Sequence, residues 1–302
     1  MSKSNFIYQK TIEKKVSTRG IGLHSGKAVK MSLLPAAENT GIVFKRTDVA
    51  EEQSLIPADY RAVSATNLGT TLENKFGIEV ATIEHLVAAL WGMEIDNVLV
   101  EINAPEIPIM DGSSADFVTL IKKAGVKEQS EPRKVLRVLK EIRVGDKKNY
   151  AKLIPAAGFS VRFEIEFDDK AIAHQKNEFA FDSETFLKDI AQARTFCRKK
   201  DVDMMHAAGL ALGGSLDNAI VVDDGKVLNP EGLRFNDEFV RHKILDSIGD
   251  LYLSRYRIQG GYIGYKAGHK INNQALRAMF DNPKGWELVD EVAPVQSKRA
   301  VV

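Results

Sequence analysis

The sequence predicts an α+β fold made of two similar halves. Segments 96–102 and 158–167 alternate apolar and polar residues, which is typical of sheet strands with one solvated face. Segment 239–253 repeats its apolar residues at helical spacing. Both halves follow the order strands, helix, strand, helix, and we therefore infer a duplicated α+β unit with a functional site between the two copies. Because this element order is common, a coincidental likeness of the halves is the alternative.

In the first half, residues 20–27 form a predicted turn between two strand-like runs. A helix over 82–91 is expected before the strand 96–102, and a turn at 111–113 leads into another helix. The polar segment 127–134 contains a proline and separates the two patterned halves. It predicts a boundary between two domains.

These domains are residues 1–128 and 129–302. In the second domain, strands are expected in 135–144 and 158–167, followed by the helix 239–253. Further along the chain, the pattern predicts a strand around 259–265, a turn at 268–269 and a helix that starts near 272–273.

The composition limits the class of protein. The chain has 302 residues, of which 44% are hydrophobic and 27% charged, with a formal net charge of +1. This balance is typical of a globular protein and argues against a nucleic-acid partner bound through a large basic excess. The N-terminus has no apolar signal core, and no apolar run approaches the roughly 18 residues of a membrane span. We therefore expect a cytoplasmic protein without a transmembrane segment.

The single cysteine, Cys197, excludes an internal disulfide and a cysteine-based metal cluster. Any metal ion must therefore be held by histidines and carboxylates. His242 and Asp246 lie four residues apart in the predicted helix 239–253, so both side chains lie on one face. With Lys243 beside them, they look like part of a metal site.

Glu84 and His85 open the other apolar helix. A helix start favours a carboxylate, so the simpler interpretation is a helix-start charge next to a partly exposed histidine. Beside His242 and Asp246, however, His85 would complete three protein ligands with an open position for water, which is the catalytic pattern for zinc. Glu84 could then act as general base toward that water.

His269 follows a glycine at the end of a predicted strand. As a cation it could protonate a leaving amine, and Asp250, four residues beyond Asp246, could hold it charged. An ordinary loop histidine is the alternative. Thr195 and Phe196 offer a hydroxyl and an aromatic ring, but their local sequence is not specific.

Seven segments, in order along nearly the whole chain, resemble the UDP-3-O-acyl-N-acetylglucosamine deacetylases, which are zinc-dependent amidases of lipid A biosynthesis in Gram-negative bacteria. They are GIGLHSGK (20–27), TIEHL (82–86), NAPEIPIMDGS (103–113), ARTF (193–196), LGGSLDNAIVV (212–222), FVRHKILDSIGD (239–250) and YKAGH (265–269).

The resemblance implies two α+β domains that pack helix to helix with the active site between them. His85, His242 and Asp246 would bind Zn²⁺, with Fe²⁺ as a possible alternative, and Glu84 would be the general base. His269 would be the acid that protonates the glucosamine nitrogen.

The same resemblance assigns supporting roles. Asp250 would orient the acid, and Thr195 would stabilise the oxyanion. Lys243 would lie near the diphosphate of the substrate, and Phe196 near the sugar nucleotide. His24 and Asp111 would have supporting roles only.

An insert at about 196–222 would form an apolar passage for the 3-O-acyl chain. Its small and apolar residues suit a passage but would also suit a plain core: Ala207, Ala208, Leu210, Ala211 and Leu212. The chain departs from the family pattern at Gly69, where some relatives have a cysteine, and at Cys197, where a glycine is common. Neither position is a ligand or an acid–base group.

The implied reaction is hydrolysis of the N-acetyl group of UDP-3-O-acyl-N-acetylglucosamine to the free amine and acetate, the committed step of lipid A biosynthesis. The expected partner is this UDP-linked substrate alone, bound by a monomer. Two alternatives stay open. One is a zinc amidohydrolase for another acylated amine. The other is a non-enzymatic module of duplicated α+β units such as some RNA-binding proteins use, although the near-zero net charge argues against it.

Overall fold

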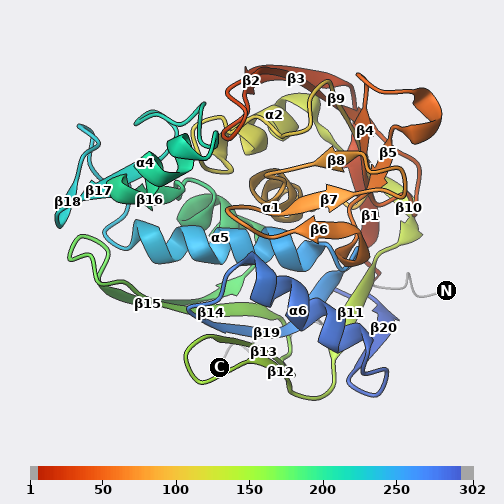
Figure 1. Ribbon diagram of the computed structural model, residues 1–302. Helices are drawn as coiled ribbons and strands as arrows, with labels where there is room; N and C mark the ends of the chain where they lie inside the picture. The colour runs from red at the N-terminus through yellow and green to blue at the C-terminus, as the bar shows by residue number, and fades with distance from the viewer. Residues whose placement is uncertain (1–5, 294–302) are drawn as a thin grey trace, which may run out of the picture.

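The computed structural model describes residues 6–293, in which two main sheets enclose a layer of helices (Figure 1). Residues 1–5 of the predicted domain 1–128 and residues 294–302 of the predicted domain 129–302 lie outside this range. Within the described range, no helix has the length and apolar character needed to cross a membrane.

The first main sheet has five strands. In order across the sheet they are β2 (Val16–Ile21), β3 (Ala28–Pro35), β9 (Val98–Ile102), β4 (Ile42–Arg46) and β5 (Leu55–Pro57). Neighbouring strands are antiparallel except β9 and β4, which run parallel. Alternate residues of β4 and β9 are buried, which confirms the predicted strand near 96–102 as a strand with one inward face.

The second main sheet has seven strands. Five of them are neighbours in the order β12 (Ile142–Gly145), β13 (Tyr150–Ile154), β19 (Arg257–Tyr265), β14 (Phe159–Glu166) and β15 (His174–Phe181). The other two are β11 (Lys134–Val138), which pairs with the first residues of β19, and β20 (Trp286–Asp290), which pairs with β11. The predicted strand 135–144 is thus two strands, which are separated by residues 139–141. In this break, the backbone N–H groups of Leu139 and Lys140 both bond to Gly285 O.

The two sheets share one topology. The order β12-β13-β19-β14-β15 repeats β2-β3-β9-β4-β5, including the single parallel pair, here β19 with β14. Helices enter at matching places, since α1 precedes β9 as α5 precedes β19. The α+β fold of two similar halves is therefore confirmed.

Four helices lie between or beside the two main sheets: α1 (Glu84–Gly92), α2 (Ala115–Ala124), α5 (Glu238–Tyr252) and α6 (His269–Phe280). Helices α1 and α5 pack directly against each other in the middle of the molecule (Figure 1). Every residue of α1 is buried, because the helix is covered by its own sheet on one side and by α5 on the other. The halves therefore meet helix to helix.

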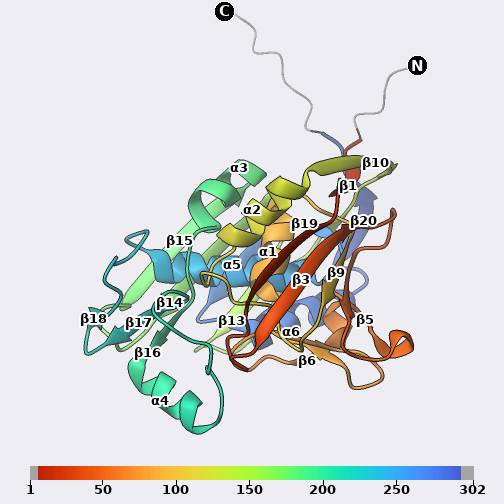
Figure 2. The same cartoon turned by 90° about the horizontal axis from the view of Figure 1, so that it is seen from above.

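Smaller elements complete the fold. They are the ribbon β1 (Tyr8–Ile12) with β10 (Val126–Pro132), the sheet β6 (Val63–Ala65), β7 (Thr71–Glu73) and β8 (Glu79–Val80), the sheet β16 (Phe196–Arg198), β17 (Ile220–Asp223) and β18 (Lys226–Val227), the helices α3 (Ser183–Thr185) and α4 (Lys199–Ala207), the π-helical turn Phe186–Ile190, and the 3-10 turns Glu51–Gln53 and Tyr60–Ala62. Figure 2 shows α4 and β16–β18 at one end of the molecule and β1, β10 and β20 at the other.

Two local expectations are corrected by the structure. The polar segment 127–134, expected to separate the two halves, is mostly strand β10, which pairs with β1. Most side chains of β10 reach solvent, so this strand needs no apolar alternation. Helix α6 begins at His269, directly after Gly268, and not near 272–273.

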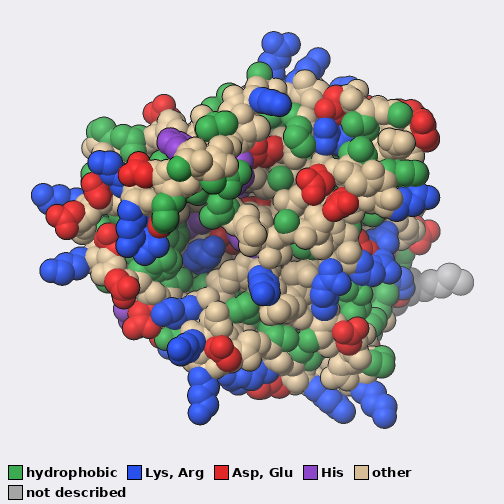
Figure 3. Space-filling view, in the orientation of Figure 1, with side chains coloured by type: hydrophobic (Ala, Val, Ile, Leu, Met, Phe, Trp, Pro, Cys, Tyr) green, Lys and Arg blue, Asp and Glu red, His purple; other side chains and the backbone are tan. Residues whose placement is uncertain are grey.

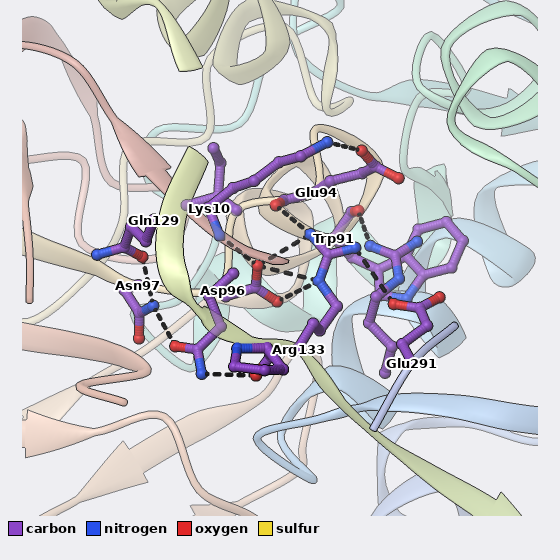
Figure 4. A network of polar contacts seen from close by, with 12 residues as sticks. Lys10, Trp91, Glu94, Asp96, Asn97, Gln129, Arg133 and Glu291 are labelled. Atoms are coloured by element: carbon purple, nitrogen blue, oxygen red, sulfur yellow. Dashed lines mark hydrogen bonds and ion pairs between the residues drawn. The ribbon is translucent and has the colours of Figure 1, made fainter. Parts of the chain in front are cut away.

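A buried arginine ties the β10–β11 junction to the first half (Figure 4). The Arg133 side chain is 2% exposed, and its Nε and Nη2 donate to the Asp96 carboxylate at 2.9–3.0 Å. Its Nη2 also donates to Glu94 O, and its Nη1 donates to Glu291 at 3.4 Å. Arg133 therefore connects the segment before β9 with the residue that follows β20.

Candidate active site

Three metal-binding side chains converge where α1 and α5 cross. His85 comes from the first turn of α1, and His242 and Asp246 lie one turn apart on α5. One potential ligand atom from each lies within 4.8 Å of the others, and all three residues are buried. Asp246 Oδ1 is 3.3 Å from His242 Nε2 and 3.6 Å from His85 Nε2.

The donor set fits a metal ion. Among the described residues, no donor reaches the buried Asp246 Oδ1, which faces both imidazole rings. His242 Nδ1 donates to Ala193 O at 3.1 Å, which leaves Nε2 free with a lone pair toward the cluster. An unpartnered buried carboxylate oxygen beside two imidazole nitrogens suits a divalent cation such as zinc.

The protonation states agree with this interpretation. Burial lowers the pKa of His242 to about 3, so its ring is neutral. Burial opposes ionisation of Asp246, but the neighbouring His242 imidazole and Lys243 ammonium group hold its pKa well below the ordinary value. A neutral imidazole and an ionised carboxylate are the forms that bind metals.

Lys243 belongs to the same cluster. Its Nζ donates to Asp246 Oδ2 at 2.6 Å. Asp246 Oδ1 accepts no hydrogen bond from the described residues and is available to a metal ion. Burial opposes the charge on Lys243, but Asp246 raises its pKa above the ordinary value. The ammonium group therefore stays charged at the wall of the cavity.

Glu84 is the first residue of α1, as expected of a helix-start charge. Glu84 and His85 are only 3% and 4% exposed, so the alternative of a partly exposed histidine is wrong. Glu84 Oε2 accepts a hydrogen bond from the backbone N–H of Thr70 at 3.0 Å. Burial raises the pKa of Glu84, although His269 and His85 oppose that rise. A carboxylate with a raised pKa next to a metal ligand is suited to accept a proton.

His269 is the first residue of α6 and no loop histidine, and its Nδ1 donates to Asp250 Oδ2 at 2.8 Å. Its Nε2 lies 3.9 Å from Glu84 Oε1. Burial and the start of a helix both disfavour a cation. The carboxylates of Asp250 and Glu84 outweigh the burial and raise the pKa of His269 to about 9. The ring is therefore protonated at neutral pH.

Two residues that the sequence analysis missed hold Asp250. Thr70 Oγ1 donates to Asp250 Oδ1 at 2.6 Å, and Asn272 Nδ2 donates to Oδ2 at 2.7 Å. Thr70 is separated from Asp250 by 180 positions, so no local pattern connects them. Asn272 follows Gly268 by four residues and lies inside α6. Because the sequence analysis expected α6 to start near 272–273, it did not predict this position.

The ARTF segment is fixed from behind by Arg194, which is 1% exposed and donates to the fully buried Glu238. Thr195 N donates to Gly112 O in the other half at 2.8 Å, so the segment lies against both halves. Phe196 packs edge-on against the His242 ring, with centroids 6.3 Å apart. Thr195 and Phe196 both line the cavity over the cluster.

A cavity of about 540 Å³ opens over these residues. It is lined by the predicted site residues Glu84, His85, Thr195, Phe196, His242, Lys243, Asp246 and His269. Asp250 lies behind His269 and not in the lining. A space-filling view shows a hollow on this face with histidine and basic side chains in it and apolar side chains beside it (Figure 3).

A second cavity of about 370 Å³ borders the first one. Both are lined by Leu23, Leu68, Thr195, Phe196, Cys197 and Met205. Of the five insert residues expected at a passage, Ala208 and Leu210 line the first cavity and Ala211 the second. Ala207 and Leu212 are absent from both linings, and the exposed Leu212 shows that this part of the insert is no core.

The remaining motif residues hold loops. The buried Glu106 accepts hydrogen bonds from the backbone N–H groups of His24 and Ser25, which fixes the turn at 20–27. Asp111 accepts a hydrogen bond from Arg234 at 2.8 Å and so links the 111–113 turn to the second half.

Of the two departures from the family pattern, Cys197 lines the cavity and Gly69 lies beside Glu84. A Cβ at position 69 would be only 2.9 Å from Glu84 Oε1, so Gly69 leaves room for this glutamate rotamer. Burial raises the pKa of the Cys197 thiol to about 11, which keeps it neutral and unreactive.

The fold and the site define an enzyme class: a two-half α+β hydrolase with a metal-binding cluster and a paired carboxylate and cationic histidine. Residues 9–281 match the model of the UDP-3-O-acyl N-acetylglycosamine deacetylase family, and the chain belongs to this family.

Individual relatives agree with this assignment. The chain is 49% identical over 285 residues to the UDP-3-O-acyl-N-acetylglucosamine deacetylases of Shewanella frigidimarina and Shewanella oneidensis, covering 94% of this chain and 93% of each relative. The deacetylase of Shewanella baltica strain OS155 is 48% identical with the same coverage.

Proposed function

We propose that this protein hydrolyses the N-acetyl group of UDP-3-O-acyl-N-acetylglucosamine to the free amine and acetate, the committed step of lipid A biosynthesis. The observation that carries this proposal is the convergence of His85, His242 and Asp246 with Glu84 and His269 around one cavity. The names of the relatives supply the substrate.

We further propose Zn²⁺ as the metal held by His85, His242 and Asp246, with Fe²⁺ as the alternative. When bound, the ion supplies Lewis acidity for the amide carbonyl and lowers the pKa of a bound water. Glu84, one residue from the ligand His85, accepts the proton of the attacking water. The raised pKa of Glu84 makes it a stronger base than an exposed carboxylate.

Loss of the amine needs a proton, because an amide anion is a poor leaving group. The C–N bond breaks as its electron pair takes a proton from His269 Nε2, and the acyl carbon leaves as acetate. Asp250 keeps this histidine cationic and oriented through its Nδ1. The Thr195 hydroxyl donates to the developing oxyanion, a contact that can contribute about 3 kcal/mol.

Substrate recognition follows from the cavity lining. Lys243 uses one of its three ammonium hydrogens on Asp246, so two remain for the diphosphate. Phe196 offers its ring to the sugar nucleotide, and the second cavity offers an apolar passage to the acyl chain. We propose that a cytoplasmic monomer of two domains, 1–128 and 129–302, binds this substrate without a nucleic-acid partner.

Purified protein tests the proposal directly. We expect stoichiometric metal by elemental analysis and acetate release from UDP-3-O-acyl-N-acetylglucosamine with acyl chains of different length. His242→Ala should lose the metal, whereas His206→Ala, which changes an exposed histidine, should keep it. Acetate release from other acylated amines but not from this substrate would contradict the substrate assignment, and full metal occupancy in His242→Ala would contradict the ligand assignment.

A further inference from the structure

Thr70 contacts both carboxylates of the proposed proton-transfer machinery. It lies directly before β7 and is 1% exposed. Its backbone N–H donates to Glu84 Oε2 at 3.0 Å, and its hydroxyl donates to Asp250 Oδ1 at 2.6 Å. One residue therefore holds the proposed base and the partner of the proposed acid at the same time.

These hydrogen bonds cross between the halves. Thr70 and Glu84 belong to the first half, while Asp250 and His269 belong to α5 and α6 of the second. His269 Nε2 and Glu84 Oε1 must stay close for base and acid to act on one amide, and they are 3.9 Å apart. The side-chain bond from Thr70 to Asp250 joins the two halves at this place.

The Thr70 hydroxyl also completes the surroundings of Asp250. Oδ2 accepts from His269 and Asn272, and Oδ1 accepts from Thr70. With donors on both oxygens, the carboxylate cannot rotate about its Cβ–Cγ bond without breaking charge-assisted hydrogen bonds. The direction of the His269 ring therefore depends on a hydroxyl group from the other half.

We propose that Thr70 is a positioning residue, which fixes the spacing between the base Glu84 and the acid His269 through its hydroxyl bond to Asp250. This inference rests on the proposed deacetylase function. It predicts that the hydroxyl affects turnover and leaves substrate binding unchanged, because Thr70 is absent from the lining of both cavities.

The test compares Thr70→Val, which removes the hydroxyl but keeps the shape and the backbone N–H, with Thr70→Ser, which keeps the hydroxyl. We expect kcat to fall about tenfold or more in Thr70→Val, with KM and metal content unchanged, since small displacements of acid and base strongly reduce the rate. Thr70→Ser should remain within about threefold of wild type.

Thr11→Val is the matched control. Thr11 is also buried, its hydroxyl donates to Asn97 O at 2.6 Å, and it lines neither cavity. Both threonine-to-valine variants should lower Tm, because each loses a buried hydrogen bond. Thr11→Val should leave kcat unchanged. If both threonine-to-valine variants had the same kcat as wild type, the positioning role would be refuted, and the hydroxyl of Thr70 would matter for stability only.

A double-mutant cycle shows whether Thr70 acts through Asp250. In an Asp250→Asn background, Thr70→Val should have little further effect on kcat, because the bond it removes has already lost its ionised acceptor. Independent, multiplicative losses would contradict the inference. If the wild-type protein released no acetate from the UDP-linked substrate, the proposed function would fail and the inference with it. Acetate release by wild type and Thr70→Val at equal rates would refute the inference alone.

Discussion

Single hydrogen bonds determine which atoms of the metal cluster remain free. His242 Nδ1 is bonded to Ala193 O, so the other ring nitrogen faces Asp246. Lys243 bonds to one oxygen of Asp246, so the other oxygen is left for a ligand. The ligand set is thus arranged before any ion binds, which reduces the cost of ordering it.

His269 gives a prediction at the same scale. Its pKa of about 9 lies above the ordinary 6.5, so the protonated ring is favoured in the folded protein. This stabilisation is fully present below pH 6.5 and is lost as the pH rises through about 9. We expect an NMR titration of the metal-free protein to give a midpoint near 9 for His269.

The Asp250→Asn variant is the control for this titration. Without the Asp250 charge, burial should bring the midpoint for His269 down, and the free energy of unfolding should depend less on pH between about 6.5 and 9. An unchanged midpoint in Asp250→Asn would contradict the assignment of Asp250 as the group that keeps His269 charged.

Where a motif was present, the sequence predicted which residues belong to the site. It did not predict which residues from separate segments contact one another. His242 and Asp246 lie on one helix face because of their spacing, and this face does point into the cluster. Thr70 and Asn272 have no such spacing to Asp250. Their bonds exist because separate segments pack around one buried carboxylate.

At the scale of elements, the approach of α1 to α5 depends on Gly249. A Cβ at this position would lie 2.2 Å from Glu84 O and 3.1 Å from Glu84 Cα. Only a residue without a side chain allows the start of α1, with Glu84 and His85, to reach the middle of α5. This contact places residues of both halves in one cluster.

Gly249→Ala tests that packing. In a free helix, the change from glycine to alanine is stabilising by about 1 kcal/mol. Here we expect a loss of about 1–3 kcal/mol in the free energy of unfolding, because the new methyl group overlaps α1 and pushes the helices apart. Urea denaturation measures the loss, and a lower metal stoichiometry should accompany it.

Gly158→Ala is the matched control, since nothing lies within 4 Å of a Cβ placed there. It should leave both the stability and the metal content near those of wild type. Equal stability of the two variants would show that the α1–α5 contact tolerates a methyl group, contrary to the packing described above.

Element boundaries show where local patterns were insufficient. The alternation in 96–102 predicted β9 well, because this strand has a single buried face. The apolar residues of 239–253 keep helical spacing, and they predicted α5 although nearly the whole helix is buried. The sequence pattern did not predict strand β10, because both of its faces are largely solvated. The start of α6 was placed late because Asn272 and Asn273 are buried helix residues that bond to Asp250 and Tyr60.

At the scale of the whole molecule, the halves are held together by the buried helix pair and by the Arg133 network at the other end (Figure 4). Arg133→Met keeps the apolar stem but removes three hydrogen bonds to Asp96. We expect a loss of about 3 kcal/mol in the free energy of unfolding, because the carboxylate is left without its buried partner.

Lys134→Met is the control for this network. Lys134 forms an exposed ion pair with Asp290, and such pairs contribute less than about 1 kcal/mol. Denaturant unfolding of both variants measures the difference. If Lys134→Met lost as much free energy of unfolding as Arg133→Met, the buried interactions of Arg133 would be no more stabilising than an exposed ion pair.

The sequence alone determined the α+β class, the likeness of the halves and the chemical types of the site residues, because these depend on local periodicity and on motifs. The tertiary structure decided which groups meet. His85 joins His242 and Asp246 only through the α1–α5 crossing, and Thr70 reaches Asp250 only across the same boundary. Such contacts depend on how buried surfaces fit together, and the order of residues along one segment does not encode that fit.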